Sequence, residues 1–225
     1  MDSNIYNSWL EVNLDDLSHN IQQVRSIIDP KCEIMAVVKS NGYGHGAIEI
    51  SKHLEKECHI SYLSVASIYE ALELRQAGIS TPILVMGTLL NNQLEEAIKN
   101  DIAQKLNKLP KVHIKIDSGM RRIGLRPGEE LLSFIRELKD LEGLDIEGVF
   151  THFAESGAID KTFTLEQLRI FKEGLEQLKE NGIEPKYVHC AATQAILEVP
   201  DSHFNLVRSG KTTYGYHGLD HEYNK

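Results

Sequence analysis

A lysine at the end of an apolar segment is the residue in this sequence best placed to act as a nucleophile. The run Met35–Val38 is apolar and directly precedes Lys39, and the segment Asn41–Gly46 that follows is rich in glycine. A lysine that is partly desolvated and close to other cations has a lowered pKa, and its amine can then attack an aldehyde. A surface lysine that merely follows a strand is the alternative, and the surrounding motif has to decide between the two.

Three further residues with suitable chemistry follow or end other β-rich runs. They are Arg122, His152 and Arg208. Reactive side chains of α/β barrels emerge at the C-terminal ends of the strands, so these residues could share one site with Lys39. An arginine matches oxygen acceptors in a forked geometry and stays protonated. Solvated arginines and a structural histidine are the alternatives.

The elements that would position these residues alternate between β-rich runs and helical patterns, which is typical of βα units around a parallel sheet. The predicted strands are Ile34–Val38, Tyr62–Ala66, Pro82–Met86, Val112–Ile116, Ile146–His152, Tyr187–His189 and Phe204–Arg208. The predicted helices are Leu14–Ile28, Ile68–Gln76, Asn92–Lys99, Gly128–Lys139 and Thr164–Asn181. Asn13 is expected to cap the first helix.

This pattern predicts an α/β fold, a TIM-like (β/α)8 barrel in which one unit is incomplete. A closed barrel has eight strands, and the sequence predicts only seven. Between Lys99 and Lys111 there are too few residues for a strand and a crossover helix of about a dozen residues. One βα unit is therefore expected to be shortened or missing there.

The composition limits the partners that the protein could have. The chain has 225 residues and a net charge of −9, and its basic residues are scattered, so nucleic acid is not expected as a partner. Three cysteines without metal-ligand spacing favour reduced thiols, and no structural metal is expected. No apolar run approaches the roughly 20 residues that cross a bilayer. The sequence therefore predicts a cytoplasmic protein without a membrane segment.

Five blocks along the chain resemble, in order, the motifs of alanine racemases. The blocks are Val37–Gly46, Val112–Gly124, Gly148–Ala154, Val188–Ala195 and Phe204–Gly210. The resemblance implies that residues 1–225 form the N-terminal barrel domain of this family, which is of fold type III and binds pyridoxal 5′-phosphate. Full members carry a second, mostly β domain, and this chain is expected to end before it.

The resemblance also implies a role for each candidate residue. Lys39 would hold the cofactor as a Schiff base and act as the catalytic base, and Tyr43 would reach the phosphate with its hydroxyl. Arg122 would steady the cofactor's phenolic oxygen and the substrate carboxylate. His152 would lie against the cofactor ring, and Arg208 would face its pyridine nitrogen, where a lasting positive charge discourages protonation of the ring.

The expected phosphate site departs from the family pattern. Thr193 can still donate a hydroxyl, and Gly210 can offer its backbone N–H. Ala192 replaces a residue that usually has a polar side chain, and Lys211 stands where relatives have an apolar residue. Lys211 either contributes its charge to the phosphate or faces solvent.

The expected function is therefore the interconversion of L- and D-alanine, with serine as an alternative substrate and a homodimer as a possible assembly. Racemisation requires a proton donor on each face of the substrate, and in this family the second comes from the C-terminal domain, so activity of this chain alone is in question. Two alternatives stay open. One is a single-domain protein that carries pyridoxal phosphate, and the other is an inactive racemase remnant.

Overall fold

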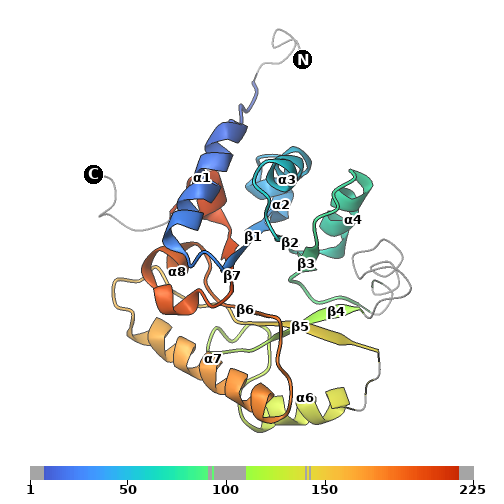
Figure 1. The fold of residues 1–225 in the computed structure, drawn as a ribbon, viewed down its shortest axis with the longest axis vertical. Coiled ribbons are helices and arrows are strands. Elements are labelled where there is room, and N and C mark those ends of the chain that lie inside the picture. The colour runs from blue at the N-terminus through green and yellow to red at the C-terminus, as the bar shows by residue number, and fades with distance from the viewer. Residues whose placement is uncertain (1–7, 91–92, 94–109, 140, 142, 218–225) are drawn as a thin grey trace.

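A computed structural model describes residues 8–90, 93, 110–139, 141 and 143–217 (Figure 1). Its strands are β1 Glu33–Val37, β2 Tyr62–Val65, β3 Ile83–Val85, β4 Lys111–Lys115, β5 Asp145–Phe150, β6 Tyr187–His189 and β7 Leu206–Ser209. Its α-helices are α1 Leu14–Ile27, α2 Lys39–Tyr43, α3 Ala47–Lys56, α4 Ile68–Gln76, α6 Glu129–Lys139, α7 Thr162–Glu180 and α8 Thr193–Glu198. Two 3-10 helices, η2 Pro200–Ser202 and η3 Lys211–Tyr214, complete the described elements.

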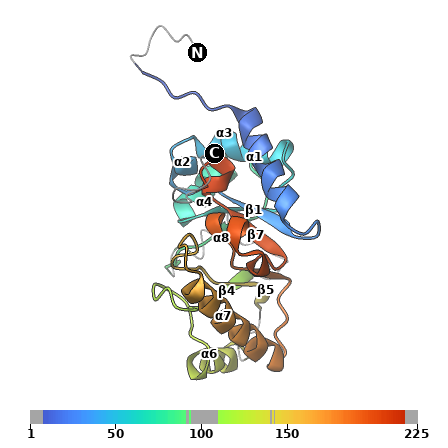
Figure 2. The same ribbon diagram turned by 90° about the vertical axis from the view of Figure 1, so that its left-hand side faces the viewer.

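The strands form two parallel sheets that meet between β6 and β7. Their orders are β3-β2-β1-β7 and β4-β5-β6. At the seam, the backbone N–H of Arg208 donates to the carbonyl of Ala191 at 3.0 Å. Helices α1 to α4 lie on one side of the molecule, and α6 and α7 lie at the opposite end (Figures 1 and 2). This arrangement is a partial TIM-like barrel, and no strand of the described ranges joins β3 to β4.

The sequence predicted the type and order of all seven of these strands, and the main corrections concern their ends. His152 does not end a strand, because β5 stops at Phe150, the last residue that pairs with the short strand β6. Helix α3 was not predicted, although its buried positions Ala47, Ile50 and Leu54 have helical spacing. The predicted helix Asn92–Lys99 and the shortened unit before Lys111 fall almost wholly outside the described residues.

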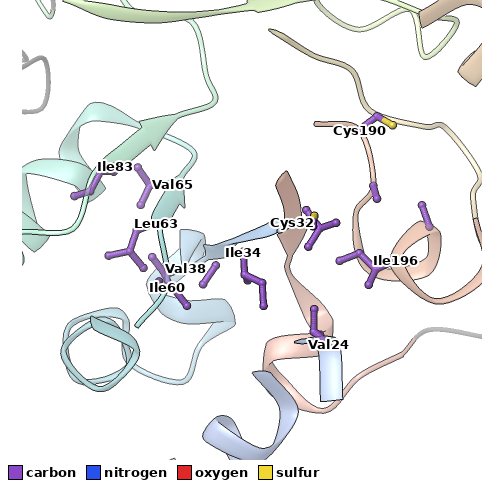
Figure 3. Close-up of a cluster of buried hydrophobic side chains, with 14 of the residues drawn as sticks. Val24, Cys32, Ile34, Val38, Ile60, Leu63, Val65, Ile83, Cys190 and Ile196 are labelled. Atoms are coloured by element: carbon purple, nitrogen blue, oxygen red, sulfur yellow. The ribbon is translucent and has the colours of Figure 1, made fainter. Parts of the chain in front are cut away.

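Side chains of the strands alternate between two surroundings. One set faces the helices and forms the larger apolar core (Figure 3). This core includes Ile34 of β1, Val38 directly after β1, and Leu63 and Val65 of β2. The other set faces the inside of the barrel, where the smaller apolar cluster consists of Met35, Tyr62, Tyr187 and Leu206. Because successive strand residues point to opposite faces, each strand contributes to both sets.

The first helix begins as predicted. The side chain of Asn13 accepts a hydrogen bond from the backbone N–H of Asp15 at 2.9 Å, so it satisfies a donor that the first helical turn leaves without a partner. Helix α1 then buries Leu17, Ile21 and Val24 on one face. None of the described helices is both long and apolar enough to span a membrane.

Candidate active site

A cavity of about 450 Å³ lies at the C-terminal ends of the strands. All eight residues predicted for the site line it. They are Lys39, Tyr43, Arg122, His152, Thr193, Arg208, Gly210 and Lys211. Lining residues that the sequence did not single out as site residues include Phe150, Gln194, Met86 and Gly87. The structure therefore brings together, in one concave site, residues that are up to 172 positions apart in the sequence.

An unusual backbone turn follows Lys39, which lies just beyond the C-terminal end of β1. Ser40, Asn41 and Gly42 have φ angles of 54°, 53° and 62°, so the chain makes a left-handed turn directly after the lysine. Such a conformation costs about 1–2 kcal/mol for each residue with a side chain. The Asn41 side-chain oxygen offsets part of this by accepting a hydrogen bond from the N–H of Ala47 at 2.8 Å. Strain of this kind is typical of functional sites.

Glu70 of helix α4 supports this turn from outside the cavity. Its carboxylate accepts hydrogen bonds from the backbone N–H groups of Ser40 at 2.6 Å, Ala66 at 2.7 Å and Ser67 at 2.9 Å. Burial raises the pKa of Glu70, but these hydrogen bonds outweigh it and hold the pKa below its usual value. Sequence reasoning missed this residue, and the capping-box spacing of Ser67 and Glu70 was its available signal.

Positive charge converges on the cavity, although the chain as a whole is acidic. Burial and, to a smaller extent, nearby cations together lower the pKa of His152 to about 3. Those cations are Arg208, Arg122, Lys115 and Lys39. His152 is therefore neutral at pH 7, and the four cations favour an anionic ligand.

Arg208 is buried and held in one orientation. Its Nη2 donates to the carbonyls of Thr151 at 2.8 Å and Cys190 at 3.0 Å, and Nη2 lies 3.2 Å from His152 Nδ1. Its Nη1 donates to the carbonyl of His189 at 3.0 Å. Burial lowers the pKa of Arg208 to about 10, which still leaves it charged at pH 7. The guanidinium is thus a fixed cation at the wall of the cavity.

Two of these cations lie beside the ring of Phe150. Lys115 Nζ lies 5.3 Å from the centre of the Phe150 ring, and Arg208 Cζ lies 5.6 Å from it. Burial lowers the pKa of Lys115 to about 8, helped by the charges of Arg122 and Arg208 and opposed by Asp117. Arg122 itself is exposed at the mouth of the cavity, where it can meet a ligand entering from solvent.

The predicted phosphate site is a space bounded by two hydroxyl groups. A Cβ atom added to Gly210 would lie 3.1 Å from the Tyr43 hydroxyl oxygen and 3.6 Å from Thr193 Oγ1, so glycine keeps this space open. Burial raises the pKa of Tyr43, which therefore stays protonated and can donate a hydrogen bond. Lys211 is exposed at the rim, where its charge can act only from the edge.

These donors suit a phosphate better than a metal ion. Hydroxyl and backbone N–H groups donate to phosphate oxygens, whereas divalent cations need several acceptor ligands. In the part of the chain that the structure describes, no three His, Cys, Asp or Glu residues are grouped so as to hold a metal ion. The donor set thus fits a ligand that combines a phosphate with a group reactive toward Lys39.

Gly87 forms part of the cavity wall. A Cβ atom there would lie 2.3 Å from the carbonyl oxygen of Ala66, which is too close for any side chain. The residue follows β3 and lets two backbone segments approach each other beside the site. Its position directly after the predicted strand Pro82–Met86 was the only sequence signal for this role.

Comparison with known proteins identifies the family of this chain. The family model of the alanine racemase N-terminal domain matches residues 12–218. Alanine racemase of Methanococcus maripaludis is 40% identical over 223 residues, which is 92% of this chain and 60% of the relative. The chain thus spans less than two thirds of the length of this curated relative.

Solved structures give the same result. Alanine racemase of Clostridium difficile 630 in complex with cycloserine is 38% identical, with a TM-score of 0.90 over 97% of this chain and 64% of that one. The Bacillus anthracis enzyme with bound L-Ala-P is also 38% identical, with a TM-score of 0.86 over 92% of this chain and 57% of that one. Because the family model covers most of the sequence, the chain belongs to the alanine racemase family and contains its N-terminal domain.

Proposed function

We propose that this chain is the cofactor-binding barrel of a pyridoxal-phosphate-dependent racemase that acts on alanine. The observation that supports it most is the meeting of Lys39, the phosphate space at Gly210 and the two arginines Arg122 and Arg208 in one cavity. The cavity volume is in the range of small-molecule sites. The same residues also admit serine as a substrate.

Each residue would have a separate task in this reaction. Tyr43, Thr193 and the Gly210 N–H would hold the phosphate, and Lys39 would hold the aldehyde carbon covalently through Nζ. When bound, the pyridine ring supplies a sink for the electron pair that remains after the α-hydrogen leaves. Arg208 would keep the ring nitrogen unprotonated, because a second positive charge beside a buried guanidinium is unfavourable.

Lys39 and Arg122 would act on the substrate. Arg122, exposed at the mouth, would bind the carboxylate of the amino acid in a forked geometry. Once the amino nitrogen of the substrate has replaced Lys39 on the aldehyde carbon, the freed Lys39 Nζ would remove the α-hydrogen as a proton from one face and return it to the same face. Inversion requires a second proton donor on the opposite face, and we assign this role to none of the described residues.

Borohydride reduction followed by peptide mapping tests the role of Lys39. We expect one pyridoxyl label on Lys39 and none in the variant Lys39→Ala, with Lys211 as an internal control that stays unlabelled. A label on another lysine, or no label at all, would refute the proposal.

Gly210→Ala tests the phosphate space, because its methyl group would enter it. We expect the dissociation constant of pyridoxal phosphate to rise at least about tenfold, and that of pyridoxal, which has no phosphate, to change much less. An equal effect on both ligands would mean that the phosphate binds elsewhere.

Measuring hydrogen exchange and inversion of alanine in heavy water distinguishes three possibilities: a cofactor-carrying protein, a complete racemase and an inactive remnant. We expect this chain to exchange the α-hydrogen of one alanine enantiomer for deuterium at least about a hundredfold faster than it inverts the centre, since inversion needs two acid–base groups and Lys39 is the one that we assign among the described residues. Equal rates would show that a second base is present in this chain. Bound cofactor without exchange would favour the carrier protein, and no bound cofactor would favour the remnant.

A further inference from the structure

A row of buried polar side chains runs through the inside of the barrel, away from the cavity. Arg208 Nη1 lies 2.9 Å from His189 Nδ1, and His189 Nε2 lies 2.9 Å from His113 Nδ1. His113 Nε2 then lies 3.6 Å from Glu147 Oε2. The side chains of His113 and Glu147 are 2% and 4% exposed, and His189 is fully buried. The row therefore joins the cavity wall to a carboxylate on another strand through side chains that lie directly against one another.

The partners fix the direction of each hydrogen bond. Arg208 can only donate, so His189 Nδ1 must accept and its proton must be on Nε2. That Nε2–H donates to His113 Nδ1, so His113 also carries its proton on Nε2, which faces the Glu147 carboxylate. Both histidines are therefore neutral and in the same tautomer, with a cation at one end of the row and an anion at the other.

The far end of the row is a stable anion. Burial raises the pKa of Glu147, but contacts with His113, Lys111 and Tyr62 outweigh it and hold the pKa at about 2. Lys111 Nζ and the Tyr62 hydroxyl both donate to its carboxylate. Glu147 reaches this position because β5 has one extra residue opposite β4. Val112 pairs with Ile146, whereas the next residue, His113, pairs with Gly148, so Glu147 is left between the two pairs.

The rings in the row have little room to turn. A Cβ atom on Gly148 would lie only 2.4 Å from His113 Nδ1, so the imidazole rests directly on the backbone of β5. On the other side, the His189 ring stacks on Phe150 with centres 5.0 Å apart and an angle of 3°. Packing and hydrogen bonds therefore select the same orientation of both rings.

We propose that Glu147 is a positioning residue for Arg208, which it holds through His113 and His189, both kept neutral with the proton on Nε2. Glu147 does not contact the cavity, and its effect on a ligand would pass entirely through the guanidinium. The consequence for chemistry rests on the proposed function, in which Arg208 faces the cofactor ring. The tautomers themselves do not depend on any bound cofactor.

Nitrogen NMR of the histidine-labelled chain, without added cofactor, tests the tautomers directly. The chain has ten histidines, so the variants His113→Gln and His189→Gln assign the two signals by their loss. We expect both residues to show a protonated Nε2 and an unprotonated Nδ1 at pH 7.5. A proton on Nδ1 of either ring, or a doubly protonated ring, would overturn the proposal.

Glu147→Gln tests the dependence on the carboxylate, because the amide keeps the shape and loses the charge. We expect both rings to keep the proton on Nε2, the His113 Nε2 signal to shift because its proton no longer faces a charged carboxylate, and the His189 signals to shift less. With pyridoxal phosphate bound, we expect incubation with alanine to form the pyridoxamine product about 3- to 10-fold faster, since Arg208 is less firmly held. A purely structural role would lower the melting temperature and leave both readouts unchanged, which would refute the proposal.

Glu33→Gln is the matched control. Glu33 also lies on the inside of the barrel, where it accepts a hydrogen bond from the Tyr187 hydroxyl at 3.1 Å, but it does not belong to the row. We expect this variant to leave the His113 and His189 signals in place, and equal shifts in both variants would count against the proposal. If Glu147→Gln does not fold, His113→Gln provides the same test at His189. Failure to bind pyridoxal phosphate would refute the proposed function alone, because the tautomers are measured without it.

Discussion

The two faces of the strands are built by different rules. The outer face packs against the helices through apolar side chains such as Ile34, Leu63 and Val207, which form one continuous core. The inner face combines a few apolar residues with Arg208, His189 and other polar groups that contact one another. We call the residues on these two faces the outer and the inner layer. The outer layer stabilises the fold by filling volume with apolar side chains, whereas the contribution of the inner layer to stability depends on whether each polar atom keeps its hydrogen-bond partner.

The largest expected loss of stability comes from removing a buried aromatic ring from the outer layer. Phe171 of α7 is fully buried and packs edge-to-face on Phe204, with ring centres 5.6 Å apart. Phe171→Ala should lower the free energy of unfolding by about 3–5 kcal/mol, because it removes apolar contacts and leaves a cavity. Urea denaturation measures this loss. The affinity for pyridoxal phosphate should be unchanged below the unfolding transition, and a large change in affinity would show that the two layers are coupled.

A hydroxyl removed from the inner layer should also destabilise the protein. Tyr62 is buried and donates to the Glu147 carboxylate. Tyr62→Phe should lower the free energy of unfolding by about 1.5–3 kcal/mol, the usual range for a hydrogen bond to a charged group. The control is Tyr187→Phe, whose hydroxyl lies 3.1 Å from Glu33, a residue that is only partly buried. If both variants lose equally little, the inner polar contacts matter less than we infer.

The contrast between layers also explains what the sequence could predict. Regular alternation and helical spacing are properties of the chain itself, so the seven strands and the helices α1, α4, α6 and α7 were predictable. The site residues were found through the five blocks that resemble alanine racemase motifs, of which those of Lys39 and Arg208 lie at or next to strands β1 and β7. Glu70 was missed although its capping-box spacing with Ser67 was visible, because its contact with Ser40 comes from elsewhere in the fold, and the bulge at Glu147 was missed because its partners do too.

The inner layer should make the protein sensitive to mild acid. His152 has a pKa of about 3 in the folded chain and an ordinary value near 6.5 when unfolded. Only the unfolded state therefore takes up a proton as the pH falls below 6.5, so stability falls by roughly 2 kcal/mol between pH 7 and pH 5. The pKa of buried His189 is lowered in the same direction and adds to this loss. Glu55 and Glu147, with pKa values of about 2, begin to contribute only below about pH 4.5.

Urea denaturation at pH 5, 6 and 7 measures this slope. The variant His152→Gln should show a shallower dependence on pH, because one of the groups that bind protons only in the unfolded state is gone. A slope equal to that of the parent chain would mean that His152 titrates normally in the folded state.

The smallest expected effect comes from a hydroxyl in the outer layer. Ser51 of α3 is fully buried among apolar neighbours, and its Oγ has no hydrogen-bond partner among the described residues. Ser51→Ala removes this unsatisfied group and places a better helix former in α3. We expect the free energy of unfolding to rise by up to about 1 kcal/mol. The sign is the informative part, since Tyr62→Phe removes the same chemical group from the other face and should lower stability. A loss of more than about 1 kcal/mol for Ser51→Ala would show that the outer layer also depends on paired polar atoms, and the distinction between the two faces would then fail.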